Sequence, residues 1–103
     1  MAIQISINLL DACVLAALEK EDMYGYSLTQ KIKSAIDISE STLYPVLRRL
    51  QKEHFLETYD TEVLGRNRRY YRITHEGKNR LGEYVKEWEN YVNGVNCLLK
   101  GKK

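Results

Sequence analysis

Apolar side chains recur at steps of three and four residues near the end of the 103-residue chain, from Leu81 to Leu99. This spacing predicts one face of an α-helix. At about 1.5 Å per residue, the stripe is longer than the small body before it can cover. We therefore expect the helix to pair with a second copy of the chain, as in a coiled coil. The positions expected in this interface are Leu81, Tyr84, Val85, Trp88, Tyr91, Val92, Val95, Leu98 and Leu99, with Leu9 from an earlier helix.

The earlier helix is expected over residues 8–20, with Asn8 as its N-cap. Its residues from Leu9 to Leu18 are apolar almost all round. Such a helix has to be covered on more than one side, which a single domain of this length can hardly supply. This helix therefore also indicates a dimer.

Composition and cysteine usage exclude several classes of protein. Hydrophobic residues make up 44% of the chain and charged residues 29%, close to the average of globular domains. The longest apolar stretch, Ala12 to Leu18, is far below the roughly 20 residues that cross a bilayer, and no secretory leader precedes it. We expect a soluble cytoplasmic protein without a membrane partner. The sequence shows no catalytic nucleophile accompanied by a general base, and no set of metal-ligating side chains. We therefore expect no enzyme, no metal and no cofactor.

The middle of the chain predicts two more helices and a hairpin. A second helix begins within Asp22 to Tyr26, and a third covers residues 41–53, with Ser39 or Ser41 as its cap. Two runs with β preference follow, 55–63 and 69–74, around a tip at 64–67, and Thr74 suits the N-cap of the last helix. The expected fold is mainly α with a small β-hairpin: a winged helix-turn-helix over residues 1–74 and a dimerisation helix over 75–103, in one compact unit.

Basic charge is concentrated in the same region. Residues 41–80 hold nine basic and five acidic side chains, a net charge of +4, whereas the whole chain carries only +2. Clustered arginines supply the phosphate-directed attraction that underlies DNA affinity. A third helix with a polar, basic outward face and a hairpin tip rich in arginine predict a protein that binds double-stranded DNA.

Helical position divides the expected DNA contacts into two kinds. We assign Ser41, Thr42 and Arg48 to base edges. The residues assigned to phosphate are Tyr44, Arg49 and Lys52 beside them and Arg66, Arg68 and Arg69 in the wing, residues 62–70. Asn67 is either a further contact or a turn residue that tolerates a positive φ.

Three stretches carry a family resemblance: Met23 to Leu28 (MYGYSL), Ser41 to Leu50 (STLYPVLRRL) and Gly65 to Gly77 (GRNRRYYRITHEG). In this order and spacing they resemble the signature stretches of the PadR family of bacterial transcriptional regulators, in its small subfamily. The resemblance implies a homodimeric repressor that binds an inverted-repeat operator, and in many members a small molecule releases it. Family members usually have glycine where this chain has His54, so we expect the third helix to end without the usual left-handed glycine.

The last helix raises the question of an effector. Glu87-Trp88-Glu89 and the apolar run after it resemble the corresponding part of the multidrug-binding, LmrR-like members. Trp88 could meet its own copy and stack on a planar hydrophobic ligand, with Val92, Asp11 and Ala12 as the other lining positions. The alternative is that Trp88 is an interface core residue and nothing more.

Two further alternatives stay open. Cys13 and Cys97 could form a redox switch, or could each be a small hydrophobic residue. His54 and His75 are interpreted as surface residues. At the level of function, the rival to a DNA-binding repressor is a winged-helix adaptor that binds protein and no longer reads DNA.

Overall fold

The computed structural model describes residues 7–101, and from residue 9 onward also the side chains. The elements follow in the order α1 (Ile7–Leu18), β1 (Met23–Tyr24), α2 (Gly25–Ala35), α3 (Glu40–Lys52), β2 (Leu56–Val63), β3 (Arg66–Ile73) and α4 (His75–Lys100). This is a winged helix with a long C-terminal helix, as predicted. Residues 1–6 and 102–103, which the expected ranges 1–74 and 75–103 include, lie outside the described residues.

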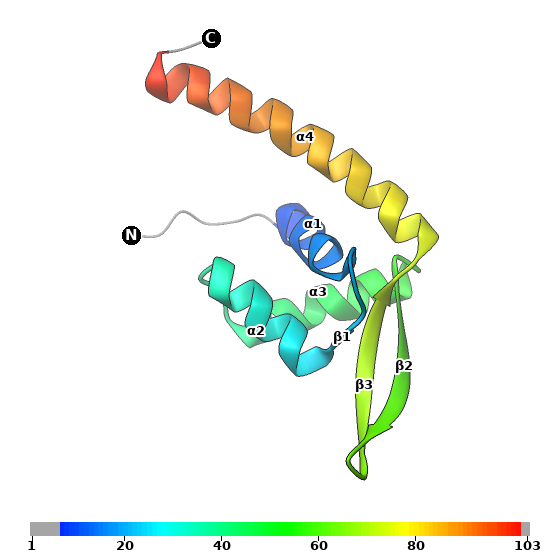
Figure 1. Cartoon of the computed structure of the whole chain (residues 1–103). Helices are drawn as coiled ribbons and strands as arrows, with labels where there is room; N and C mark the ends of the chain where they lie inside the picture. Colours follow the sequence, from blue (N-terminus) through cyan, green and yellow to red (C-terminus); the bar gives the residue numbers. More distant parts are fainter. Residues whose placement is uncertain (1–6, 102–103) are drawn as a thin grey trace.

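Helix α1 lies at the centre of the fold. It packs on α4 on one side and on α2 and α3 on the other, and Figure 1 shows it between them. The fully buried side chains include Leu10, Val14, Leu15 and Leu18 of this helix. The apolar helix is therefore covered mostly within its own chain. The predicted cap was wrong, because Asn8 lies inside α1.

The sheet has three antiparallel strands in the order β1-β3-β2, one more than expected. The added strand is two residues long: Met23 pairs with Tyr71, and Tyr24 with Tyr70. It occupies the segment in which α2 was expected to begin, so α2 starts only at Gly25. Gly25 lies against Tyr71, whose ring would be 3.3 Å from an added Cβ.

The hairpin turn is tighter than predicted. Val63 pairs with Arg66, which leaves only Leu64 and Gly65 in the turn, with φ of 53° and 78°. Two positive φ angles are typical of a type I′ turn, which matches the twist of the flanking strands. Arg66 and Asn67 are consequently strand residues and not part of the tip. Since its φ is not positive, Asn67 does not serve as a turn residue, and that interpretation was wrong.

Two helix caps are confirmed. The Ser39 hydroxyl accepts a hydrogen bond from the Thr42 N–H at the start of α3, and the Thr74 hydroxyl accepts one from the Gly77 N–H at the start of α4. These side chains satisfy backbone donors that a helix leaves unpaired at its first turn.

Helix α3 ends on a left-handed residue even though it lacks the glycine that is usual in the family. His54 has φ 66°. Its N–H donates to the carbonyl of Gln51, and the Phe55 N–H donates to the carbonyl of Leu50. This pair of bonds is the Schellman arrangement, which normally has glycine at the left-handed position. The hydrogen bonds of this helix end are thus kept, although His54 has to adopt a left-handed conformation that is strained for a residue other than glycine.

Helix α4 divides into a packed first part and a free second part. Leu81 and Tyr84 are only 4% and 7% exposed, because they pack into the core of their own chain. Their assignment to a dimer interface was therefore wrong. Beyond them the apolar stripe is open, with Leu98 85% and Leu99 79% exposed. In Figure 1 this part of α4 extends past the rest of the fold. Among residues 7–101 no helix is both long and apolar enough to span a bilayer.

Candidate nucleic-acid interface

The outward face of α3 presents polar and basic side chains to solvent. Its exposed residues include Ser41, Thr42, Tyr44, Arg48 and Lys52. The opposite face is anchored in the core by Leu43, Val46, Leu47 and Leu50, which are buried. The amphipathic pattern of α3 thus holds the predicted contact residues on a rigid surface.

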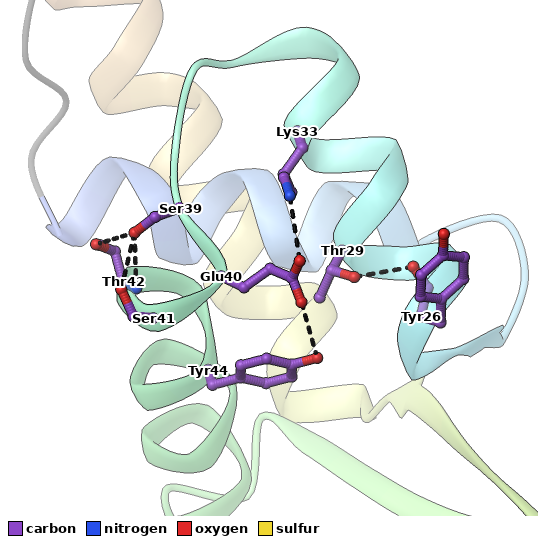
Figure 2. Close-up of polar contacts among 8 residues, drawn as sticks. All are labelled: Tyr26, Thr29, Lys33, Ser39, Glu40, Ser41, Thr42 and Tyr44. Atoms are coloured by element: carbon purple, nitrogen blue, oxygen red, sulfur yellow. Dashed lines mark hydrogen bonds and ion pairs between the residues drawn. The ribbon is translucent and has the colours of Figure 1, made fainter.

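A cluster of hydroxyl groups lies at the N-terminus of α3. The Ser39 Oγ is 3.0 Å from both the Ser41 Oγ and the Thr42 Oγ1 (Figure 2). Hydroxyl groups both donate and accept hydrogen bonds, and the N-terminus of a helix favours negative charge. This end of α3 can therefore bind either phosphate oxygens or base edges.

Glu40, beside this cluster, makes a contact with α2 that sequence reasoning missed. Its carboxylate forms an ion pair with Lys33 of α2 at 3.2 Å and lies 3.5 Å from the Tyr44 hydroxyl, as Figure 2 shows. Lys33 thereby offsets the one acidic charge of α3's first turn. The pairing joins residues seven apart on different helices, so no helical spacing could reveal it.

Arg48 and Arg49 point to different environments. Arg48 is exposed and makes no hydrogen bond or ion pair with the described part of the chain. Arg49 donates to both carboxylate oxygens of Asp11 in α1 and lies 3.6 Å from Glu53. The assignment of Arg49 to phosphate is therefore corrected, because its guanidinium already serves a buried carboxylate of its own chain.

The wing arginines lie on both faces of the hairpin. Arg66 is exposed and without a side-chain partner among residues 9–101. Arg68 is half-buried, with its guanidinium 4.8 Å from the centre of the Tyr24 ring. Arg69 points to the other face and lies 3.4 Å from Asp60. Of these three arginines, Arg66 is the one whose guanidinium contacts no other side chain among the described residues.

The face of the sheet that carries Arg68 also holds an aromatic row. The rings of Tyr59 and Tyr70 stack with centroids 5.6 Å apart, and Tyr24 lies 6.1 Å from Tyr70 on the other side. The Tyr59 hydroxyl donates to Asp22 at 2.6 Å, and this hydrogen bond is the main reason that the pKa of Tyr59 is raised. The row stiffens the base of the wing.

Tyr71 connects the other face of the sheet to α3. Burial raises the pKa of its phenol, while the positive charges of Arg69 and Arg48 act in the opposite direction. The positive charges that act on Tyr71 therefore come from both α3 and the hairpin.

The residues expected to line an effector pore do not share one environment. Trp88 is exposed and lies 6.4 Å from the Tyr91 ring, and Val92 and Ala12 are half-buried. Asp11, by contrast, is 2% exposed. Because its carboxylate is held by Arg49 and by Tyr84 of the same chain, the assignment of Asp11 to an effector site between two chains is corrected.

The remaining candidates are two cysteines and two histidines. Cys13 is half-buried and Cys97 exposed, and both are free thiols. Burial raises the pKa of Cys13, which disfavours the reactive thiolate. His54 and His75 are on the surface, as interpreted. No group of three potential metal ligands lies together within residues 9–101.

Comparison with known proteins identifies the fold family. The model of the transcriptional regulator PadR-like family matches residues 14–83. The transcriptional regulator Rv3488 of Mycobacterium tuberculosis is 38% identical over 75 residues, which are 72% of this chain and 70% of that protein.

Solved structures agree over nearly the whole chain. The crystal structure of smu.1704 from Streptococcus mutans is 39% identical, with a TM-score of 0.90 over 100% of this chain and 97% of that one. The PadR-like regulator BC4206 of Bacillus cereus is 36% identical, with a TM-score of 0.81 over 88% and 91% of the two chains. The chain belongs to the PadR-like family of transcriptional regulators, which bind DNA and are not enzymes.

Proposed function

We propose that this regulator is a homodimeric repressor that binds an inverted-repeat operator in the cytoplasm. Helix α3 enters the major groove, where Ser41, Thr42 and Arg48 contact base edges, and Tyr44 and Lys52 contact the flanking phosphates. The wing lies along the neighbouring backbone or minor groove through Arg66, with Arg68, Arg69 and Asn67 beside it. The observation that carries this proposal is Arg48 on the polar face of α3, which is exposed and pairs with no other side chain among residues 9–101.

The test is an anisotropy titration of the purified protein against its own upstream DNA and a scrambled duplex at two salt concentrations. We expect tighter binding to the upstream DNA and a steep loss of affinity as salt rises, because neutralised phosphates release counterions. Binding to neither duplex at low salt would favour the protein adaptor instead.

Dimerisation is proposed through the outer part of α4. Exposed apolar side chains are spread along this part of the helix: Val85, Trp88, Tyr91, Leu98 and Leu99, with Val92 and Val95 half-buried. A contiguous apolar stripe of this kind is costly in water and is normally covered by a partner. A second copy covers it by two-fold symmetry, with Leu9 of α1 at the margin.

An effector site is proposed around Trp88 in that interface, with Val92 and Ala12 beside it. Trp88 is the single tryptophan of the chain, so its fluorescence reports on one position. A planar aromatic cation such as an acridine should quench this fluorescence and loosen operator binding in the same concentration range. If neither occurs, Trp88 is an interface core residue only.

A further inference from the structure

The least exposed charged side chain of the described structure joins three helices. Asp11 of α1 is 2% exposed, and both of its carboxylate oxygens are bonded. One accepts from the Arg49 Nη1 of α3 at 3.0 Å and from the Tyr84 hydroxyl of α4 at 3.2 Å, and the other accepts from the Arg49 Nη2. We call these three residues the Asp11 triad.

The triad is specific to one arrangement of the helices. A buried carboxylate is tolerated only when its oxygens are paired, and a paired guanidinium binds it in a planar, two-pronged geometry. A shift of α3 against α1 would break the bonds of Arg49 and leave the Asp11 charge uncompensated, and a shift of α4 would break the hydrogen bond of Tyr84. The cost of that loss makes the angle between the helices well defined.

The surroundings make the triad the polar connection between α3 and α4. Helix α4 packs on the rest of the chain mainly through α1. An open hollow of about 660 Å³ lies where α3 and α4 face each other, and Asp11, Arg49 and Tyr84 are part of its lining. At its other edge, Arg80 lies 4.5 Å from the centre of the Tyr84 ring and pairs with Glu83 at 2.8 Å. Because a hollow and not a packed core separates α3 and α4 here, the bonds of the triad constrain the orientation of one helix relative to the other.

We propose that the Asp11 triad sets the orientation of the recognition helix α3 relative to α4, and thereby the half-site spacing that the dimer accepts. The inference rests on the proposed function, in which α4 pairs the chains and α3 reads the DNA. A rotation of about 10° at a radius of about 20 Å moves a helix by roughly 3.5 Å, about the rise of one base pair. A small change in this angle therefore changes the preferred spacing. Arg49 and Tyr84 act as positioning residues and touch no DNA.

Two variants weaken the triad to different extents. Tyr84→Phe keeps the packed ring and removes one of the three hydrogen bonds. The double variant Asp11→Leu/Arg49→Met replaces the ion pair with apolar groups, which avoids the unpaired charge that makes single removals of a buried partner strongly destabilising. Glu83→Gln is the matched control, because this residue borders the same hollow on α4 but does not touch Asp11.

The experiment selects binding sites from a library of random-sequence duplexes with the full-length wild type, both triad variants and the control. Sequencing the enriched duplexes gives the half-site sequence and the spacing between half-sites separately. We expect the wild type and Glu83→Gln to enrich one spacing about tenfold over its neighbours, and the double variant to reduce this preference to about twofold with the same half-site sequence. Tyr84→Phe should fall between them.

The outcomes of this experiment separate a failure of the inference from a failure of the proposed function. An unchanged, sharp spacing preference in the folded double variant would overturn the positioning role, and so would a changed half-site sequence. A wild type that enriches no paired half-sites would instead overturn the proposed operator binding and the inference with it. If the double variant does not fold, an unaltered spacing profile for Tyr84→Phe alone would refute the inference.

Discussion

Single residues of this chain carry constraints that the pattern of the helices does not reveal. Asp11 and Arg49 meet although they lie 38 positions apart in the sequence. Nothing in the helical pattern indicates the pairing, and this is why Arg49 was assigned to phosphate on its position beside Arg48. His54 is restricted by its conformation and Gly77 by the space around it.

His54→Gly should stabilise the protein. Histidine at φ 66° carries a steric cost that glycine avoids, and the hydrogen bonds of the helix end remain available. We expect a gain of about 1 kcal/mol, or a melting temperature higher by roughly 4–8 °C in thermal unfolding. Glu53→Gly is the control: its φ is −84°, so glycine there relieves nothing and should not stabilise. Equal effects of the two substitutions would contradict this explanation.

Gly77→Ala should destabilise the protein by about 2–4 kcal/mol. An added Cβ would lie 2.3 Å from the Phe55 carbonyl oxygen and 2.8 Å from Ile73, and the oxygen belongs to the backbone. Gly82→Ala on the same helix is the matched control, because its added Cβ meets nothing within 4 Å. There alanine should gain roughly 0.5–1 kcal/mol from its better helix propensity. Denaturant unfolding of both variants distinguishes a clash from a propensity effect.

Helices and strands differ in how much of them the sequence could predict. The apolar stripes of α3 and α4 and the caps Ser39 and Thr74 were predictable, because each depends on residues within one or two turns. Strand β1 was not, since two residues show no alternation and form a strand only by pairing with β3. The pattern of α4 indicated where its apolar face lies, but not that α1 covers Leu81 and Tyr84.

The recognition helix and the wing should contribute differently to DNA binding. Arg48→Ala removes a proposed base contact. The difference in binding free energy between the operator and the scrambled duplex should therefore shrink by roughly 1–3 kcal/mol. Arg66→Ala removes a proposed phosphate contact, so both affinities should fall alike and the salt slope should decrease by about one. Anisotropy titrations over a salt series measure both quantities. Equal losses on both duplexes in both variants would contradict this division.

At the scale of the whole molecule, the fold places its two free surfaces on different elements. The outer part of α4 is apolar, while α3 and the hairpin carry the basic face. Figure 1 shows the hairpin projecting on the side away from α4. A pair of chains joined along α4 can therefore leave both wings accessible.

The double variant Leu98→Glu/Leu99→Glu should convert the proposed dimer to a monomer. Both side chains are exposed in the single chain, so the fold should be unaffected, whereas two carboxylates per chain would face an apolar partner surface. Sedimentation equilibrium should give half the mass of the wild type, with unchanged circular dichroism. A wild type that is already monomeric at micromolar concentration would refute the proposed dimer.

Hydroxyl-radical footprinting on the protein's own upstream DNA tests the central claim most directly. If two recognition helices read an inverted repeat, the wild type should protect two segments centred about 10–10.5 base pairs apart, or a multiple of this, and Arg48→Ala should lose both together. A single protected segment, protection without fixed positions, or a footprint unchanged by Arg48→Ala would contradict a dimer that reads DNA through α3.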